Sequence, residues 1–231
     1  MKKSTKLYIT SGVFFLVFVI FTLLATKCDV QTVNVLNIFT GDTSETTAIG
    51  FAEINTAVAD LIGVHLLWYK ITDILGYLAL LVVAFFGLLG VAQLVQRKSL
   101  AKVDKDILAL GGFYAVVLVF YVIFEKVVIN CRPVIVDLEE GLEASYPSSH
   151  TMLAVCVFTT AIFQFNSRIK NDTLAKVIDI VCAVLLVATV VGRLISGVHW
   201  FTDIIGGLLL SASLIIAYCA TVVLLKAKKR A

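Results

Sequence analysis

Long apolar runs separated by short polar segments fill almost the whole chain, and this pattern predicts its architecture. None of the runs shows the period of two that marks a strand of a membrane barrel. Because backbone groups in lipid must find their hydrogen bonds within the chain, we expect helices. The sequence therefore predicts an all-α integral membrane bundle that forms one domain over residues 1–231. Six runs are long enough to be transmembrane helices, namely 7–26, 71–95, 106–125, 148–165, 177–195 and 204–225.

The basic residues between the runs predict the orientation of the bundle. Six spans place both termini on one side of the membrane, and 14 of the 19 Lys and Arg residues fall on that side. By the positive-inside rule, this side is the cytoplasmic one. The first apolar run is too long for the core of a signal peptide, so we expect a retained anchor helix. The outer side receives Lys27, Lys70, Lys126, Arg132 and Arg193.

The longest outer segment lies between the first two spans, at about residues 27–68. Apolar residues near helical spacing at 49–62 predict an amphipathic helix on the membrane surface. Two roles stay open for this helix, the border of an entrance for lipid or simple covering structure. Cys28 in this segment and Cys131 after the third span both fall on the outer side, where they can form a disulfide or remain two thiols.

The composition agrees with a membrane protein and narrows the function classes. The chain is 60% hydrophobic and 15% charged, with a mean hydropathy of +0.99, whereas a soluble domain is about 25% charged. The pI of 8.6 does not indicate nucleic-acid binding, because the basic surplus lies mainly in inner loops and tails that face lipid head groups. No Cys/His spacing suggests zinc, and no carboxylate cage suggests another metal.

Polar residues gather in three clusters at the outer ends of the spans, where polar side chains indicate function. The first cluster, residues 126–133, contains the cations Lys126 and Arg132. The second is residues 146–150 and the third is residues 192–203. Short loops can bring all three to one bilayer depth, so we expect them to meet.

The second cluster combines an anion site with a titratable group. Pro147 suits the first turn of a helix, where free amides and the hydroxyls of Ser148 and Ser149 favour an anion. His150 beside them can exchange a proton near neutral pH. Taken alone, this cluster fits equally an ordinary helix cap beside an interfacial histidine.

The third cluster has the elements of a nucleophilic site. His199 and Asp203 are four residues apart and share one face if Asp203 opens a helix. A carboxylate there can hold one imidazole nitrogen as N–H and leave the other free to attack. Arg193 adds a planar fork suited to phosphoryl oxygens. A structural His–Asp pair is the alternative for this cluster alone, but two of the three histidines among several cations indicate a phosphate site.

The order of these residues resembles a known family. A lysine and Arg-Pro, then Pro-Ser-x-His, then Arg-x5-His-x3-Asp is similar to the motifs of the type 2 phosphatidic acid phosphatase superfamily. That superfamily includes lipid phosphate phosphatases and bacterial undecaprenyl-pyrophosphate and phosphatidylglycerophosphate phosphatases, and it shares its site with vanadium haloperoxidases. The motifs span residues 126–203, and the six-span plan extends the resemblance over the whole chain.

The resemblance implies a role for each motif residue. His199 is expected to be the nucleophile that forms a phosphohistidine, and Asp203 to orient it. His150 would protonate the leaving group and then activate water. No metal or cofactor is implied. The expected phosphate ligands are Lys126, Arg132, Arg193, Ser148 and backbone amides near Ser149.

The chain departs from the family pattern at three positions. The family usually has six residues between its lysine and Arg-Pro, whereas Lys126 is one residue closer and Glu125 stands at the usual distance. Ser149 replaces the usual glycine before the histidine. Gly192 replaces the usual serine before Arg193 and removes one hydroxyl from the site.

The sequence therefore predicts a membrane lipid phosphatase, with a polyprenyl pyrophosphate, phosphatidylglycerophosphate or phosphatidate as the substrate. We expect it in a bacterial plasma membrane with its site at the outer face. A lipid phosphotransferase would use the same intermediate, and a transporter or scaffold also fits six spans. Acidic residues between the first two motifs either bind a cation, discourage highly anionic substrates or form a solvated loop; they are Asp137, Glu139, Glu140 and Glu143.

Overall fold

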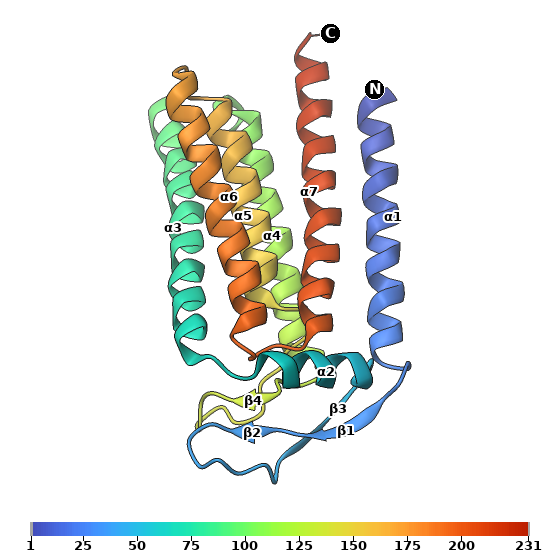
Figure 1. The fold of residues 1–231 in the computed structure, drawn as a ribbon. Helices are drawn as coiled ribbons and strands as arrows, with labels where there is room; N and C mark the ends of the chain where they lie inside the picture. Colours follow the sequence, from blue (N-terminus) through green and yellow to red (C-terminus); the bar gives the residue numbers. More distant parts are fainter. Residues whose placement is uncertain (1, 231) are drawn as a thin grey trace.

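The computed structural model describes residues 2–230, apart from the side chains of residues 228–230. It places a helix over each of the six apolar runs, and these helices lie side by side as a bundle (Figure 1). Both termini lie at one end of the bundle, and the longest connecting segment covers the other end. The bundle helices are α1 (Lys2–Ala25), α3 (Leu66–Arg97), α4 (Lys105–Lys126), α5 (Ser149–Asn166), α6 (Asp172–Ile195) and α7 (Phe201–Arg230).

Five of these helices, α1, α3, α4, α6 and α7, are long and apolar enough to cross a membrane. The predicted mostly helical membrane fold is confirmed to that extent. Helix α5 is not among the five because polar residues such as His150, Gln164 and Asn166 dilute its apolar character. It packs against α3, α6 and α7, and half of its residues are buried. That α5 also crosses the bilayer stays a prediction.

The end opposite the termini is closed by a small cap that the apolar pattern did not predict in detail (Figure 1). Strands β1 (Gln31–Asn34) and β3 (Thr46–Ile49) pair antiparallel, and β2 (Leu36–Asn37) pairs parallel with β4 (Val134–Ile135). A 3₁₀ turn, η1 (Leu100–Lys102), joins α3 to α4 at the other end. The cap therefore ties the segment between α1 and α2 to the segment between α4 and α5.

Helix α2 (Ala52–Ile62) forms within the predicted amphipathic stretch. Its buried Asn55 donates to Thr202 Oγ1 at 2.9 Å and accepts from the Thr202 amide at 3.1 Å. These bonds fix α2 to the first turn of α7. Whether α2 lies on a membrane surface stays a prediction. Cys28 and Cys131 are both free thiols.

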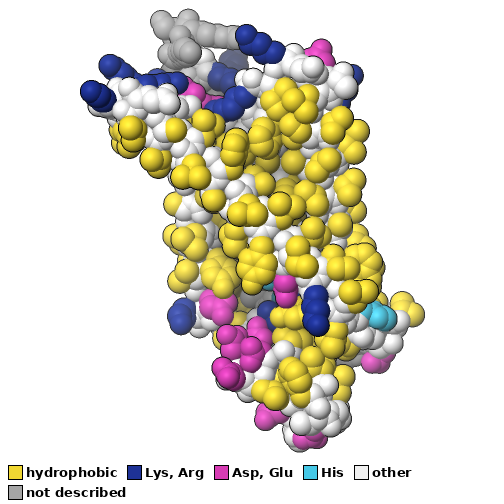
Figure 2. All heavy atoms as spheres, turned by 90° about the vertical axis from the view of Figure 1, so that its left-hand side faces the viewer, with side chains coloured by type: hydrophobic (Ala, Val, Ile, Leu, Met, Phe, Trp, Pro, Cys, Tyr) yellow, Lys and Arg dark blue, Asp and Glu magenta, His cyan; other side chains and the backbone are white. Residues whose placement is uncertain are grey.

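The surface divides into zones along the bundle axis. Figure 2 shows a broad band of hydrophobic side chains across the face that includes α3. On this face Lys and Arg gather at the end that carries the termini, and Asp and Glu gather at the capped end. An apolar band between two charged ends is the pattern expected of a protein that crosses a bilayer.

Candidate active site

The three polar clusters meet at the capped end of the bundle, where α5 and α7 begin. The Ser148 amide donates to the Asp203 backbone oxygen at 3.0 Å, which joins the starts of the two helices. Ser148 is also the N-cap of α5, where its hydroxyl accepts from the Thr151 amide at 3.4 Å. Asn130 of the first cluster donates to Asp203 Oδ1 at 3.1 Å. The predicted convergence of the three motifs is therefore present.

Asp203 is a fully buried carboxylate held by several donors. Besides Asn130, the Trp200 amide donates to Oδ2 at 2.8 Å, and the Ser145 hydroxyl donates to the same oxygen. A buried carboxylate is stable only with such partners. Ser145 and Asn130 were not among the predicted site residues, since nothing in their local sequence shows that they face Asp203.

His199 is oriented through a hydroxyl as well as by Asp203. Its Nδ1 lies 3.0 Å from Ser145 Oγ and 3.6 Å from Asp203 Oδ2. Because Ser145 gives its proton to Asp203, its oxygen can accept from Nδ1–H. This network assigns the neutral tautomer with the proton on Nδ1 and the lone pair on Nε2. The predicted arrangement of orienter and attacking nitrogen fits this geometry.

The other ring nitrogen of His199, Nε2, is buried. Nε2 has no hydrogen-bond partner among the described residues. Burial, and then the positive charges of Arg193 and Arg132, hold the pKa of His199 well below its ordinary value of 6.5. His199 is therefore a neutral imidazole near pH 7, with an unshared pair that can attack phosphorus.

Arg193 is a fully buried cation at the end of α6. Its NH2 donates to His150 Nδ1 at 2.7 Å, and its NH1 donates to Thr72 Oγ1 at 3.2 Å and to Asp73 Oδ1 at 3.1 Å. The guanidinium also lies 5.1 Å from the centre of the Tyr69 ring. The predicted His150–Arg193 neighbourhood is present, whereas the contribution of α3 through Asp73 was missed.

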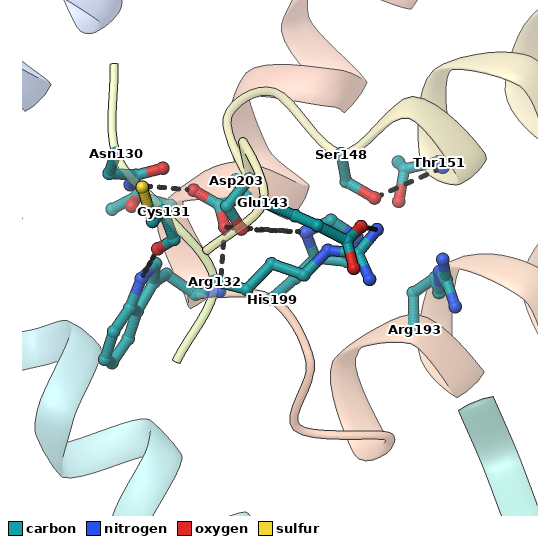
Figure 3. A network of polar contacts seen from close by, with 12 residues as sticks. Asn130, Cys131, Arg132, Glu143, Ser148, Thr151, Arg193, His199 and Asp203 are labelled. Carbon is teal, nitrogen blue, oxygen red and sulfur yellow. Dashed lines mark hydrogen bonds and ion pairs between the residues drawn. The ribbon is translucent and has the colours of Figure 1, made fainter. Parts of the chain in front are cut away.

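Arg132 is paired with an acidic residue of the preceding region. Its NH2 lies 2.9 Å from Glu143 Oε2, and both side chains are largely buried. Figure 3 shows these two side chains beside His199, with Ser148 and Arg193 farther along the same site. Burial raises the pKa of the Glu143 carboxyl, and the nearby charge of Arg132 offsets only part of this shift. One member of the predicted acidic loop is thus part of the site.

Several buried polar atoms of the site have no partner among the described residues. Leaving such atoms unpaired costs free energy, about 1–3 kcal/mol each and more when charged. The unpaired donors include nitrogens of Arg132 and Arg193, whose charges act on His199, and a multiply charged oxyanion would satisfy them. The unpaired atoms are Arg132 Nε and NH1, Arg193 Nε, His199 Nε2, Thr151 Oγ1 and Asn130 Oδ1.

Lys126 is the one predicted phosphate ligand that the structure does not bring into the site. It is the exposed last residue of α4, and its side chain makes no ion pair or hydrogen bond among the described residues. A cavity of about 20 Å³ beside His199 is lined instead by Glu125, together with Ser149 at the start of α5. The shifted spacing in the sequence therefore corresponds to a real exchange of a cation for a carboxylate at this wall. No group of metal-ligating side chains occurs in the described chain.

Comparisons with known proteins point in the same direction as the motifs. The family model described as the PAP2 superfamily matches residues 106–226. The solved structures include a match titled the first transmembrane PAP2 type phosphatidylglycerolphosphate phosphatase from Bacillus subtilis. It has 19% sequence identity and a TM-score of 0.54, covering 91% of this chain and 93% of that one. At this identity the match supports the fold alone. No curated protein matches the chain.

Proposed function

Since this chain belongs to the PAP2 superfamily, whose membrane members include lipid phosphatases, we propose that it hydrolyses a lipid phosphate through a phosphohistidine on His199. The observation that carries this proposal is the state of the imidazole. Its Nδ1 is held by Ser145 and Asp203, and its buried Nε2 has no partner. An imidazole in that state has an unshared electron pair on Nε2 that is available to attack an electrophile.

In the first step, His199 Nε2 attacks phosphorus while the bond between phosphorus and the leaving oxygen breaks. His150 gives its proton to that oxygen, and a P–N bond forms. In the second step, water gives a proton to His150 and attacks phosphorus as the P–N bond breaks. General acid–base work of this kind typically contributes about 10²–10⁴-fold.

The phosphoryl oxygens would take the donors that are now unpaired or weakly committed. Arg132 and Arg193 offer the largest charge, and the Ser148 hydroxyl with the first amides of α5 completes a helix N-terminal anion site. Ser149 lines the same wall. We assign no step to Lys126, because it lies outside this set. These groups stabilise charge that develops on the oxygens in the transition state.

The position of the site favours a substrate whose apolar part stays in the bilayer. The site lies at the end of helices that carry an apolar surface band (Figure 2). We therefore propose a lipid phosphomonoester or pyrophosphate, such as a polyprenyl pyrophosphate or phosphatidylglycerophosphate, at the outer face of a bacterial plasma membrane. The Bacillus protein of similar fold is titled a phosphatidylglycerophosphate phosphatase.

The test is release of inorganic phosphate by the purified chain from a panel of these lipids in mixed micelles. We expect wild-type protein to exceed the His199→Ala variant by several orders of magnitude on at least one lipid. Equal rates for the two proteins on every lipid would defeat the proposal. Adding a lipid alcohol to the same assay separates hydrolysis from phosphotransfer, because transfer would give a phosphorylated acceptor in place of free phosphate.

A further inference from the structure

Asp73 lies on α3, which contributes none of the motif residues, yet its carboxylate reaches the site. Its Oδ1 lies 3.3 Å from His150 Nε2 and 3.1 Å from Arg193 NH1. The side chain retains 29% exposure, so it stands at the border between the buried arginine and the more open side of the histidine. One carboxylate thus contacts both the expected acid–base group and an expected phosphate ligand.

The backbone of α3 is shaped to admit the His150 ring next to Asp73. Gly76, three residues after Asp73, faces that ring. A Cβ at Gly76 would lie 2.9 Å from His150 Cδ2 and 3.1 Å from His150 Nε2. The glycine therefore provides the space that lets the imidazole lie against α3 with Nε2 directed at the carboxylate.

The contact between α3 and α6 is equally close. A Cβ at Gly192 would lie 2.7 Å from Thr72 Cγ2 and 3.1 Å from Trp68 Cε3. The glycine that replaces the usual serine before Arg193 thus allows α3 to approach α6. This approach places Asp73 within reach of Arg193. The glycine at position 192 and the contact between Asp73 and Arg193 are therefore linked through the packing of α3 on α6.

The hydrogen bonds assign a state to His150. A guanidinium can only donate, so Arg193 NH2 donates to Nδ1, which must carry a lone pair. The proton of the neutral ring then lies on Nε2 and is donated to Asp73. His199 is held at Nδ1 by Asp203 and Ser145, whereas His150 is held at Nε2 by Asp73 and at Nδ1 by Arg193.

We propose that Asp73 is a positioning residue for the acid–base work of His150, an inference that rests on the proposed phosphatase function. When substrate phosphate draws the Arg193 fork, Nδ1 is released toward the reacting atoms while Asp73 keeps Nε2–H. Nδ1 first takes a proton from solvent, which gives the doubly protonated ring; in the first step that proton passes from Nδ1 to the leaving oxygen as the P–O bond breaks and the bond from His199 to phosphorus forms. In the second step Nδ1 takes a proton from a water molecule. The oxygen of that water bonds to phosphorus as the P–N bond breaks.

The charge of Asp73 favours the doubly protonated ring that the first step needs. The other charged or titratable groups that act on His150 or stand beside it are Arg193 from α6, Arg132 from the segment before β4, and His199 from the α6–α7 turn. Each of those is basic. Among the described groups that act on His150, Asp73 is therefore the one whose negative charge stabilises its imidazolium.

The experiment compares two substrates that differ in their need for a proton. A long-chain alkyl phosphate has a poor leaving group, whereas p-nitrophenyl phosphate leaves without protonation. We compare kcat/KM, which reports the steps up to departure of the leaving group and not the later hydrolysis that both substrates share. We expect Asp73→Asn to lower it on the alkyl phosphate by about 10²-fold and on the aryl phosphate by no more than a few-fold. The basic limb of the alkyl-phosphate pH profile should move to lower pH, because losing the negative charge lowers the pKa of His150. Asp73→Glu should restore part of the lost rate.

The matched control is Asp106→Asn, which removes another carboxylate paired with an arginine, Arg168 at 2.9 Å, at the opposite end of the bundle. It should leave both rates unchanged, and melting of each variant in detergent reports its fold. An equal loss on both substrates would show that Asp73 serves Arg193 or the fold instead, and no loss would remove its role altogether. A wild-type chain no faster than His199→Ala on either substrate would overturn the phosphatase proposal itself, and this inference with it.

Discussion

At the scale of single residues, the link between His199 and Asp203 runs largely through a serine. The sequence predicted the two side chains on one helical face, but His199 precedes α7, and the direct contact is 3.6 Å. Ser145 fills the interval by accepting from the ring and donating to the carboxylate. Its hydroxyl is therefore expected to carry part of the orienting role assigned to Asp203.

Ser145→Ala should lower kcat by about 10-fold or more while leaving KM nearly unchanged. The change removes one donor from a buried carboxylate, at a cost of about 1–3 kcal/mol, and leaves Nδ1 with only the longer contact to Asp203. Steady-state phosphate release measures the effect. Ser211→Ala is the matched control, because this buried hydroxyl bonds the Gly207 backbone oxygen at 2.7 Å within α7. Equal activity of the two variants would remove Ser145 from the orienting network.

Glu143 pairs with one nitrogen, NH2, of the Arg132 guanidinium that substrate phosphate is expected to need. Glu143→Gln should tighten inhibition by vanadate or inorganic phosphate about 3- to 10-fold, which corresponds to roughly 0.6–1.4 kcal/mol. The size is modest because the carboxylate and its partner keep some contact with water. Glu139→Gln, an exposed change in the same loop, should leave the inhibition constant as it is. Weaker inhibition of the Glu143→Gln variant would contradict the competition.

The same residue gives a pH dependence with a definite sign. Burial raises the pKa of Glu143, so acidification neutralises its carboxylate before the ordinary surface carboxylates. The advantage of Glu143→Gln over wild type should therefore be largest at neutral pH and shrink as the pH falls. Inhibition constants for both proteins across this range provide the measurement, since titration of the inhibitor itself cancels in their ratio. A ratio that grows on acidification would assign the effect to another group.

At the scale of helices and strands, the apolar pattern predicted the bundle but not the contacts between its members. The motif residues at the starts of α5 and α7 could be found because they are adjacent in sequence to helix-start signals and to one another. Asp73 lies inside an apolar run, and its partners depend on how α3 packs against α5 and α6. A carboxylate in such a run was nevertheless a signal, since ionisable residues at membrane depth are usually functional.

The cap shows a second limit of the sequence. Its strands are only two to four residues long, and β2 pairs with β4 from a segment almost one hundred residues away. Pairing at that separation leaves no periodic pattern to read. Lys126 is the converse case. The family motif implied that it belongs to the site, whereas at the end of α4 Glu125 lines the wall of the cavity and Lys126 is exposed.

The fit of α3 against His150 can be tested on its own. Gly76→Ala would place a methyl group 2.9 Å from the ring, so the imidazole must shift by a few tenths of an ångström. Misplacement on that scale should lower kcat on an alkyl phosphate about 10-fold or more, because acid–base catalysis requires hydrogen-bond geometry. Gly87→Ala in the same helix is the control, since a Cβ there meets nothing within 4 Å. A Gly76→Ala enzyme as fast as the control would show that the imidazole can shift without losing the geometry that catalysis needs.

At the scale of the whole molecule, the site and the chain termini lie at opposite ends of the bundle (Figure 1). On the face that Figure 2 shows, Lys and Arg gather at the end with the termini, and Asp and Glu gather at the capped end. The positive-inside rule then predicts a cytoplasmic terminal end and an outward site. An outward site would act on lipids whose phosphate lies in the outer leaflet, so the orientation decides which pool of substrate the enzyme can use.

The exposed thiol of Cys28 offers a direct test of that orientation, because it follows α1 and its backbone oxygen accepts from the Phe51 amide beside the start of α2. In a Cys131→Ser background, a membrane-impermeant maleimide should label Cys28 in right-side-out spheroplasts of a bacterial host. The control chain replaces both outer cysteines by serine and carries Lys98→Cys, at the exposed end of α3 near η1. It should react only after the membrane is opened. The reverse pattern would place the phosphate site in the cytoplasm, and its substrates would then have to come from the inner leaflet.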